Sequence, residues 1–131
     1  MILQDKGKVS EKADFIPGRP APVRFRHMSA EERKALVEKN SAYGRVICRC
    51  ETITEGEILD AIHAPAGAID VDGVKRRTRA GMGRCQGGFC GPRVLELISR
   101  TRGIDPLDVL QDKAGSNVLL CETKQEGTNH D

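Results

Sequence analysis

Four of the five cysteines stand in two close pairs, and paired thiolates are typical ligands of metal ions and metal clusters. The pairs are Cys48 with Cys50 and Cys85 with Cys90, separated by 34 residues, and Cys121 stands apart. An odd number of cysteines in a chain without an apolar leader argues against a disulfide framework. We therefore expect the four paired cysteines to form a metal site and Cys121 to be a small buried hydrophobic residue.

The spacing within each pair bears on the choice of metal. Structural zinc sites usually place two to four residues between paired cysteines, whereas one residue separates Cys48 from Cys50, so a local turn is needed. The second pair lies among five glycines in residues 81–92, and glycine allows backbone N–H groups to approach sulfur. This pattern favours a sulfur-rich cluster. Four thiolates also suit a tetrahedral zinc ion, so a structural zinc module stays open.

Charge is strongly segregated along a chain whose net charge is only +2. Residues 50–74 carry a net charge of −6 and residues 75–103 a net charge of +7. The basic run Lys75–Arg79, followed by Arg84, leads into the second cysteine pair, and Arg49 lies within the first. A cluster of two ferric ions, two sulfides and four thiolates is formally anionic, as is zinc with four thiolates. We expect this basic run to stabilise such a site.

Other functions have less support. A helix-turn-helix nucleic-acid binder using Lys75–Arg79 is the weakest alternative, because the chain has only four aromatic residues and a small net charge. The dinucleotide-binding pattern is broken by Gln86, no P-loop is present, and we expect no catalytic site in this chain alone. The scattered histidines, His27, His63 and His130, are predicted to be surface or packing residues.

Membrane insertion is not expected either. The longest apolar run is Val118–Cys121, far short of the roughly 20 residues that span a bilayer. The first residues lack the apolar core of a secretory signal, so we expect a cytoplasmic protein.

Two helices are predicted to place the cysteines. Thr54 and Glu57 form a capping box after the first pair, which predicts a helix that begins there and ends before Pro65. After Cys90, apolar residues recur at helical spacing until Gly103. Both cysteine pairs thus precede helix N-termini, whose free N–H groups and positive dipole ends favour an anionic group.

Weaker signals complete a mainly helical fold with short β segments. They predict a helix over Ala30–Lys39 capped by Ser29 and Glu32, a short basic helix from Asp72 through Arg79, a helix from Asp105 to near Gln111, and short strands at Val46–Arg49 and Val118–Cys121. Three prolines in residues 14–26 indicate an extended linker, so the predicted organisation is a linker or docking segment over 1–28, a domain over 29–121 and a disordered tail over 122–131.

The stretches Cys48-Arg-Cys-Glu-Thr-Ile-Thr-Glu-Gly-Glu-Ile and Gly73-Val-Lys-Arg-Arg-Thr-Arg-Ala-Gly-Met-Gly-Arg-Cys-Gln-Gly-Gly-Phe-Cys-Gly-Pro-Arg-Val, within roughly residues 40–111, carry a family resemblance. They resemble the bacterioferritin-associated-ferredoxin-like (BFD-like) [2Fe-2S] binding domain, in the form found at the C-terminal end of FAD-dependent glycerol-3-phosphate dehydrogenase-like oxidoreductases. The resemblance implies a small helix-turn-helix domain that transfers electrons through one [2Fe-2S] cluster.

The resemblance also implies specific roles. Cys48 and Cys50 would hold one iron, and Cys85 and Cys90 the other. FAD would lie only on a separate parent domain or subunit, so the expected partner is a flavin oxidoreductase domain or subunit. Candidate docking residues are Phe15, Ile16, Val23, Phe25 and the segment Val118–Leu120.

Overall fold

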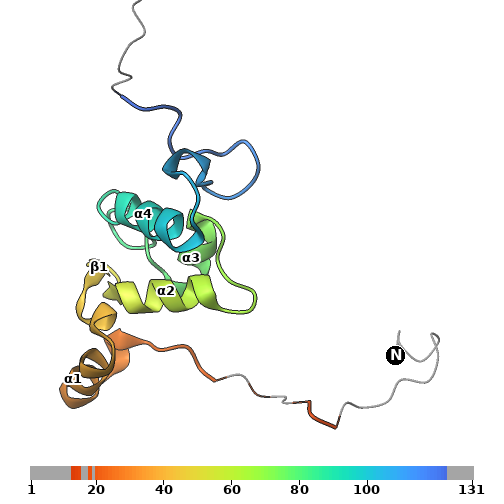
Figure 1. Cartoon of the computed structure of the whole chain (residues 1–131). Helices are drawn as coiled ribbons and strands as arrows, with labels where there is room; N and C mark the ends of the chain where they lie inside the picture. Colours follow the sequence, from red (N-terminus) through yellow and green to blue (C-terminus); the bar gives the residue numbers. More distant parts are fainter. Residues whose placement is uncertain (1–12, 16–17, 19, 124–131) are drawn as a thin grey trace, which may run out of the picture.

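The structure, a computed structural model, describes residues 13–15, 18 and 20–123. As predicted, this part of the chain is mainly helical with short β segments, and its elements follow one another along the chain in Figure 1. The helices are α1 (Ala30–Lys39), α2 (Glu55–His63), α3 (Val71–Thr78) and α4 (Gly91–Arg102), the strands are β1 (Val46–Cys48) and β2 (Ile53–Thr54), and 3₁₀ helices lie at Phe25–His27, Ser41–Gly44 and Pro106–Asp108.

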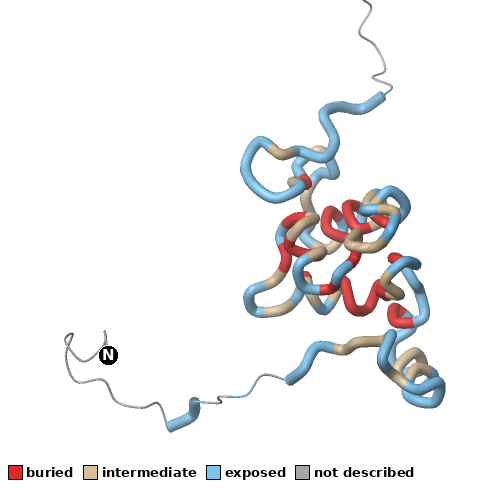
Figure 2. Tube along the Cα trace, turned by 180° about the vertical axis from the view of Figure 1, so that it is seen from behind, coloured by how far each residue is buried: buried red, intermediate tan, exposed pale blue. Residues whose placement is uncertain are grey.

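Helices α2, α3 and α4 enclose one small core. Each contributes a side chain with no exposed surface, namely Ile58, Val74 and Leu97. Figure 2 shows the buried segments gathered where these helices meet, while α1 stands to one side. Cys48 and Cys90 belong to the same buried cluster, so the core reaches the predicted metal ligands.

Helix caps lie where the sequence predicts them. The Ser29 hydroxyl accepts a hydrogen bond from the Glu32 amide at 3.2 Å, and the Glu32 carboxylate accepts one from the Ser29 amide at 2.7 Å. Thr54 and Glu57 form the same capping box at the start of α2. Helix α4 ends at Arg102, and its C-cap is Gly103, whose φ of 64° is the left-handed conformation that glycine adopts readily. These predictions are confirmed.

The start of α3 differs from the prediction. Asp70, and not Asp72, is the N-cap, since its carboxylate accepts a hydrogen bond from the Gly73 amide at 2.5 Å. Asp72 lies in the first turn, where it accepts a hydrogen bond from the Gln111 side chain at 2.6 Å. The helix therefore begins earlier than predicted and ends one residue before Arg79.

The helix predicted from Asp105 to near Gln111 does not form. A single 3₁₀ turn at Pro106–Asp108 takes its place. The carbonyl groups of Leu110 and Gln111 accept hydrogen bonds from the first two N–H groups of α3, at 3.1 and 2.9 Å. These bonds satisfy N–H groups that have no partner inside a helix, and they hold the Leu110–Gln111 backbone beside α3.

The strand predicted over Val118–Cys121 is also wrong. Only an isolated antiparallel bridge forms nearby, between Leu110 and Asn117. The buried position in this region belongs to Val109, whereas the whole predicted strand is exposed. Cys121 is therefore an exposed thiol and not the buried hydrophobic residue that we expected.

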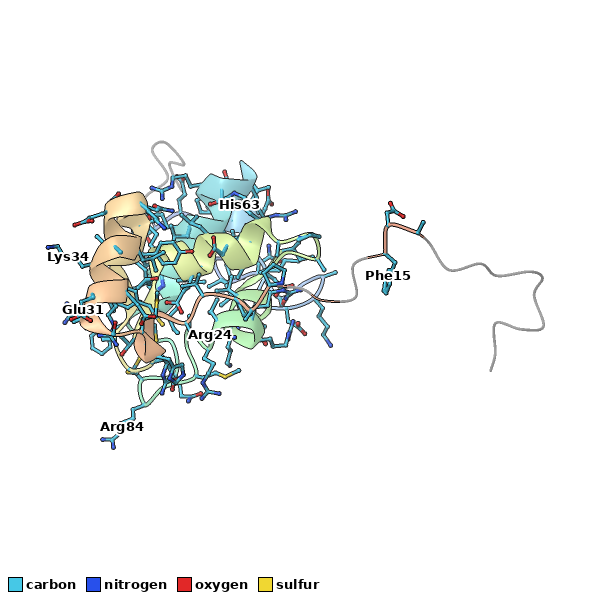
Figure 3. The ribbon with its side chains drawn as sticks, turned by 90° about the horizontal axis from the view of Figure 1, so that it is seen from below. Phe15, Arg24, Glu31, Lys34, His63 and Arg84 are labelled. Atoms are coloured by element: carbon cyan, nitrogen blue, oxygen red, sulfur yellow. The ribbon has the colours of Figure 1, made fainter. Side chains whose placement is uncertain are left out.

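The end of the predicted linker lies against the domain. Phe25 is half-buried, its amide donates to the Glu57 carboxylate at 3.3 Å, and the Arg33 guanidinium lies 5.1 Å from the centre of its ring. Arg24 lies on the segment that passes in front of the helices in Figure 3, while Phe15 lies well away from them. Ile16 falls outside the described residues, as does the predicted tail from residue 124 onward.

Among the described residues, no helix combines the length and apolar character needed to cross a membrane. The boundaries proposed at residues 28 and 121 stay predictions.

Candidate metal centre

The first cysteine loop is a tight connection between two short strands. Strand β1 pairs antiparallel with β2, with an irregular register, and turns occupy residues 49–52 between them. Thr52 has a φ of 54°, a conformation that is uncommon for a β-branched residue. The turn that the one-residue spacing required is thus present, and it leaves Cys48 buried in the core and Cys50 exposed.

The second cysteine loop joins α3 to α4 through a series of turns. It starts at Arg79, which has a φ of 77°, and includes Gly81 and Gly87, each with a φ of 87°. Glycine adopts this left-handed backbone without the steric cost that other residues meet. Cys85 lies in the middle of the loop, and Cys90 is the N-cap residue of α4.

The two loops come into contact at their cysteines. The sulfur of Cys50 lies 3.7 Å from the sulfur of Cys85. Gly83 lies against Cys50. A Cβ atom placed on Gly83 would stand only 2.2 Å from the Cβ of Cys50. The close approach of the loops therefore requires glycine at this position.

The surroundings act differently on two of the thiols. Backbone N–H groups, first that of Phe89 and then those of Gly87 and Gly88, together with the Cys50 side chain, lower the pKa of the Cys85 thiol. Burial, followed by the neighbouring Cys48, raises the pKa of Cys90 to about 11. The surroundings thus favour the thiolate form of Cys85 and disfavour that of Cys90.

All four cysteines line one cleft of about 750 Å³. The other lining residues are Val46, Ile47, Arg49, Arg84, Phe89 and Arg93. Two thiolates bound to one tetrahedral metal through bonds of about 2.3 Å lie roughly 3.7 Å apart, which the sulfurs of Cys50 and Cys85 match.

In the part of the chain that the structure describes, no three His, Cys, Asp or Glu side chains are grouped to hold a single ion. A [2Fe-2S] cluster takes four cysteine thiolates and divides them between two metals, so the chemistry of the four thiols in the cleft fits that group. His27 and His63 are exposed, as expected for histidines outside the site, and His130 lies outside the described residues.

A buried carboxylate holds the first loop to α4. Glu55 accepts two hydrogen bonds from the guanidinium of Arg45, at 2.7 and 2.8 Å, and also faces Arg93 and Arg100 at 3.7 and 3.4 Å. The hydrogen bond from Arg45 is the largest cause of the lowered pKa of Glu55. Because Arg45 precedes β1 and Arg93 lies in α4 and lines the cleft, this carboxylate joins the segment before the first loop to α4.

A second carboxylate joins the two cysteine loops. Glu51 accepts hydrogen bonds from Arg79 at 2.8 Å and from Arg26 at 3.0 Å, which lowers its pKa, with Arg79 as the first cause. Arg79 is therefore paired with a carboxylate and does not line the cleft. The predicted role of the basic run needs this correction, because none of Lys75–Arg79 lines the cleft.

Two other arginines are available to an anionic cluster. Arg49 and Arg84 line the cleft, and neither forms an ion pair with a carboxylate among the described residues. Figure 3 shows the side chain of Arg84 extending away from the fold. Phe89, with 89% of its surface exposed, also lines the cleft. It was not predicted from the sequence. Arg84 and Arg49 are thus the members of the predicted basic set that line the cleft, and their compensation of an anionic group stays a prediction.

Comparison with known families matches residues 46–100 to the BFD-like [2Fe-2S] binding domain. The matched stretch begins at β1, ends within α4 and contains all four cysteines of the cleft. Residues 46–100 are a BFD-like [2Fe-2S] binding domain. The resemblance drawn from the sequence is confirmed.

Curated relatives of this BFD-like domain are much longer oxidoreductase proteins. The chain is 50% identical over 119 residues to the glycerol 3-phosphate dehydrogenase of Caloramator mitchellensis, covering 91% of this chain and 25% of that protein. It is 34% identical over 85 residues to one subunit of the anaerobic glycerol-3-phosphate dehydrogenase of Escherichia coli K12. That match covers 62% of this chain and 15% of that subunit. It is 42% identical over 65 residues to one subunit of the opine oxidase of Rhizobium meliloti. That match covers 49% of this chain and 12% of that subunit.

The chain therefore spans a quarter or less of the length of these relatives. No solved structure matches the chain.

Proposed function

We propose that Cys48, Cys50, Cys85 and Cys90 ligate one [2Fe-2S] cluster, through which this domain passes single electrons within a larger oxidoreductase. The observation that carries the proposal is the meeting of two distant loops in one cleft, with the sulfurs of Cys50 and Cys85 at 3.7 Å. The match of this stretch to a [2Fe-2S] binding family supports it.

The cluster, when bound, supplies a site that gains and loses one electron. The residues of this chain hold and tune it. Glu51 and Glu55 fix the loops through their arginine partners, and the N–H groups from Gly87 to Phe89 favour negative charge on the sulfur of Cys85. Arg49 and Arg84 place positive charge on the rim of the cleft.

We further propose that the electron partner is a flavin oxidoreductase domain or subunit, with FAD held outside this chain. The names of the relatives, a glycerol 3-phosphate dehydrogenase and one subunit of an opine oxidase, describe enzymes that remove electrons from a substrate. Their lengths leave room for a substrate-oxidising part beyond the matched region. By this analogy the parent reaction is the oxidation of glycerol 3-phosphate.

The rim of the cleft is the surface proposed to face that flavin partner. Phe89 and Val46 are exposed there beside Arg49 and Arg84, so an apolar centre is combined with unpaired positive charge. An acidic partner surface would complement it. Of the docking residues predicted from the sequence, Phe25 instead packs against its own domain, while Phe15 and the segment Val118–Leu120 stay exposed.

The test is metal analysis of protein purified and reconstituted without oxygen. We expect two irons and two acid-labile sulfides per chain, visible charge-transfer absorption, and an EPR signal after reduction by one electron. A colourless protein that retains stoichiometric zinc after the same treatment would overturn the proposal in favour of a structural zinc module. The cytoplasmic location expected from the sequence stays a prediction.

A further inference from the structure

The short 3₁₀ helix Phe25–His27 lies before the matched family domain, yet it is bound to the first cysteine loop. The guanidinium of Arg26 donates a hydrogen bond to Oε2 of Glu51 at 3.0 Å. The same oxygen accepts a hydrogen bond from the guanidinium of Arg79 at 2.8 Å. Glu51 directly follows Cys50, and Arg79 lies at the start of the second loop, so three segments of the chain meet at one carboxylate.

The backbone of this 3₁₀ helix is anchored independently of that ion pair. The Phe25 amide donates to Oε1 of Glu57 at 3.3 Å, while the other oxygen of this carboxylate caps α2. The Arg33 guanidinium, from α1, donates to the carbonyl groups of Phe25 and Arg26, both at 3.0 Å, and lies over the Phe25 ring. These contacts fix the backbone from which Arg26 extends, so less freedom is lost when its side chain binds Glu51.

The place of this contact gives it more influence than its strength. The Arg26 side chain is 41% exposed, and an ion pair so accessible to water adds little to the stability of a fold. It nevertheless acts on Glu51, whose side chain is only 13% exposed and which lies in the turn that carries Cys50. Contacts that fix the neighbours of a metal ligand change how firmly the metal is held, and they tune its properties.

We propose that Arg26 is a positioning residue of the cluster site, and that through Glu51 it fixes the turn of Cys50 against the second cysteine loop. This inference rests on the proposed function, because it takes Cys50 to be a ligand of a bound cluster. Cys48 is held in the hydrophobic core, whereas Cys50 is exposed and lies outside that core. The position of Cys50 therefore depends on the contacts of its turn, to which a segment outside the matched family domain contributes.

Release of iron to a chelator, measured on protein loaded with its cluster, tests the proposal. In Arg26→Gln we expect release about two- to fivefold faster than in the wild type, because exposed ion pairs contribute free energies of this order. Arg26→Lys keeps a charge that can reach Glu51 and should restore most of the wild-type rate.

Arg24→Gln is the matched control for this measurement. It removes the same charge from the same segment, and Arg24 forms no ion pair with a carboxylate among the described residues. We expect it to release iron at the wild-type rate. Equal rates in Arg26→Gln and Arg24→Gln would overturn the proposal.

A double-variant cycle tests whether Arg26 acts through Glu51. Added to Glu51→Gln, the change Arg26→Gln should alter the release rate less than it does in the wild type, because the contact is already weakened. If the two changes instead multiply the rate independently, Arg26 acts elsewhere and the proposal is wrong.

The EPR signal of the reduced cluster adds a measurement that a purely structural role would not change. We expect a broadened signal in Arg26→Gln and the wild-type signal in Arg26→Lys and Arg24→Gln, because a less firmly held Cys50 makes the cluster geometry more varied. An unchanged signal with only a lower unfolding temperature would show that Arg26 stabilises the fold alone, against the proposal. A wild-type protein that binds no iron and sulfide would instead refute the proposed function, so the two failures are distinguishable.

Discussion

The loop of Cys48 and Cys50 and the loop of Cys85 and Cys90 reach the same cleft by different means. The first is held by a two-stranded ladder and by the carboxylates of Glu51 and Glu55, which bind arginines of other segments. The second contains no regular element before α4 and depends on turns at left-handed backbone positions. The first loop thus depends on polar contacts between distant residues. The second depends largely on glycines, whose lack of a side chain permits its turns and its close approach to the first loop.

The largest loss of stability and of bound iron is expected at Gly83, where the second loop must leave space for Cys50 of the first. In Gly83→Ala the new methyl group would overlap the Cβ of Cys50, so the loops must separate. We expect a loss of about 3 kcal/mol in unfolding free energy and a loss of bound iron. Thermal unfolding and iron analysis measure both effects.

Gly91→Ala is the matched control, since nothing lies within 4 Å of the added Cβ there. Gly91 is also the first residue of α4, where alanine favours the helix. Equal iron content and stability in the Gly83 and Gly91 variants would show that the loops do not meet as described.

The next effect concerns the buried carboxylate of Glu55, at the start of α2. Glu55→Gln removes the negative charge that faces three arginines, and we expect a loss of about 2 kcal/mol in unfolding free energy. Denaturant unfolding measures the change. Each of these arginines keeps substantial contact with water, so the loss stays below that of a fully enclosed ion pair.

The same carboxylate predicts a pH dependence with a defined sign. The pKa of Glu55 is lowered in the folded protein, first by the hydrogen bond from Arg45. Its contribution is therefore fully present above the ordinary glutamate value of 4.5 and is lost as the pH falls through the lower folded-state pKa. We expect the stability difference between wild type and Glu55→Gln to shrink in this acidic range. A constant difference would contradict the assignment.

A smaller effect is expected at the contact that joins the loops directly. Glu51→Gln weakens the pairs with Arg79 and Arg26, whose guanidinium groups are well exposed, so we expect a smaller loss in unfolding free energy than for Glu55→Gln. Because the pair with Arg79 joins the two cysteine loops, the proposed cluster site predicts faster removal of iron by a chelator in this variant, most clearly at low salt. Glu31→Gln, on the exposed surface of α1, is the control and should release iron at the wild-type rate.

The comparison of the loops also explains what could be predicted from the sequence. Capping boxes such as Thr54 with Glu57 join residues three apart, and they placed α1 and α2 correctly. The cysteine pattern identified the four cysteines that line the cleft, but not apolar lining residues such as Phe89. The partners of Glu51 and Glu55, by contrast, lie up to 45 residues away in the sequence, and no local pattern specifies them.

Contacts between residues far apart in the sequence also explain the predictions that were wrong. Asp105–Pro106 is a good local helix start, but the backbone that follows binds the first turn of α3, which only the tertiary fold shows. The acidic surplus of residues 50–74 beside the basic surplus of residues 75–103 was the available signal for the Glu51–Arg79 contact. We assigned that basic charge to the metal site instead.

The smallest effect is expected at the cysteine that belongs to neither loop. Cys121 is exposed and does not line the cleft, so Cys121→Ser should keep the iron content and unfolding free energy of the wild type. Cys85→Ser, in a ligand position, should reduce the iron content and lower the unfolding temperature of the cluster-loaded protein, because ligand binding contributes to folding. In the loaded protein a thiol reagent should modify Cys121 alone, since the other four sulfurs would be bound to iron. Modification of Cys50 at a similar rate would show that this exposed cysteine is free, and it would contradict its proposed role as a ligand of the cluster.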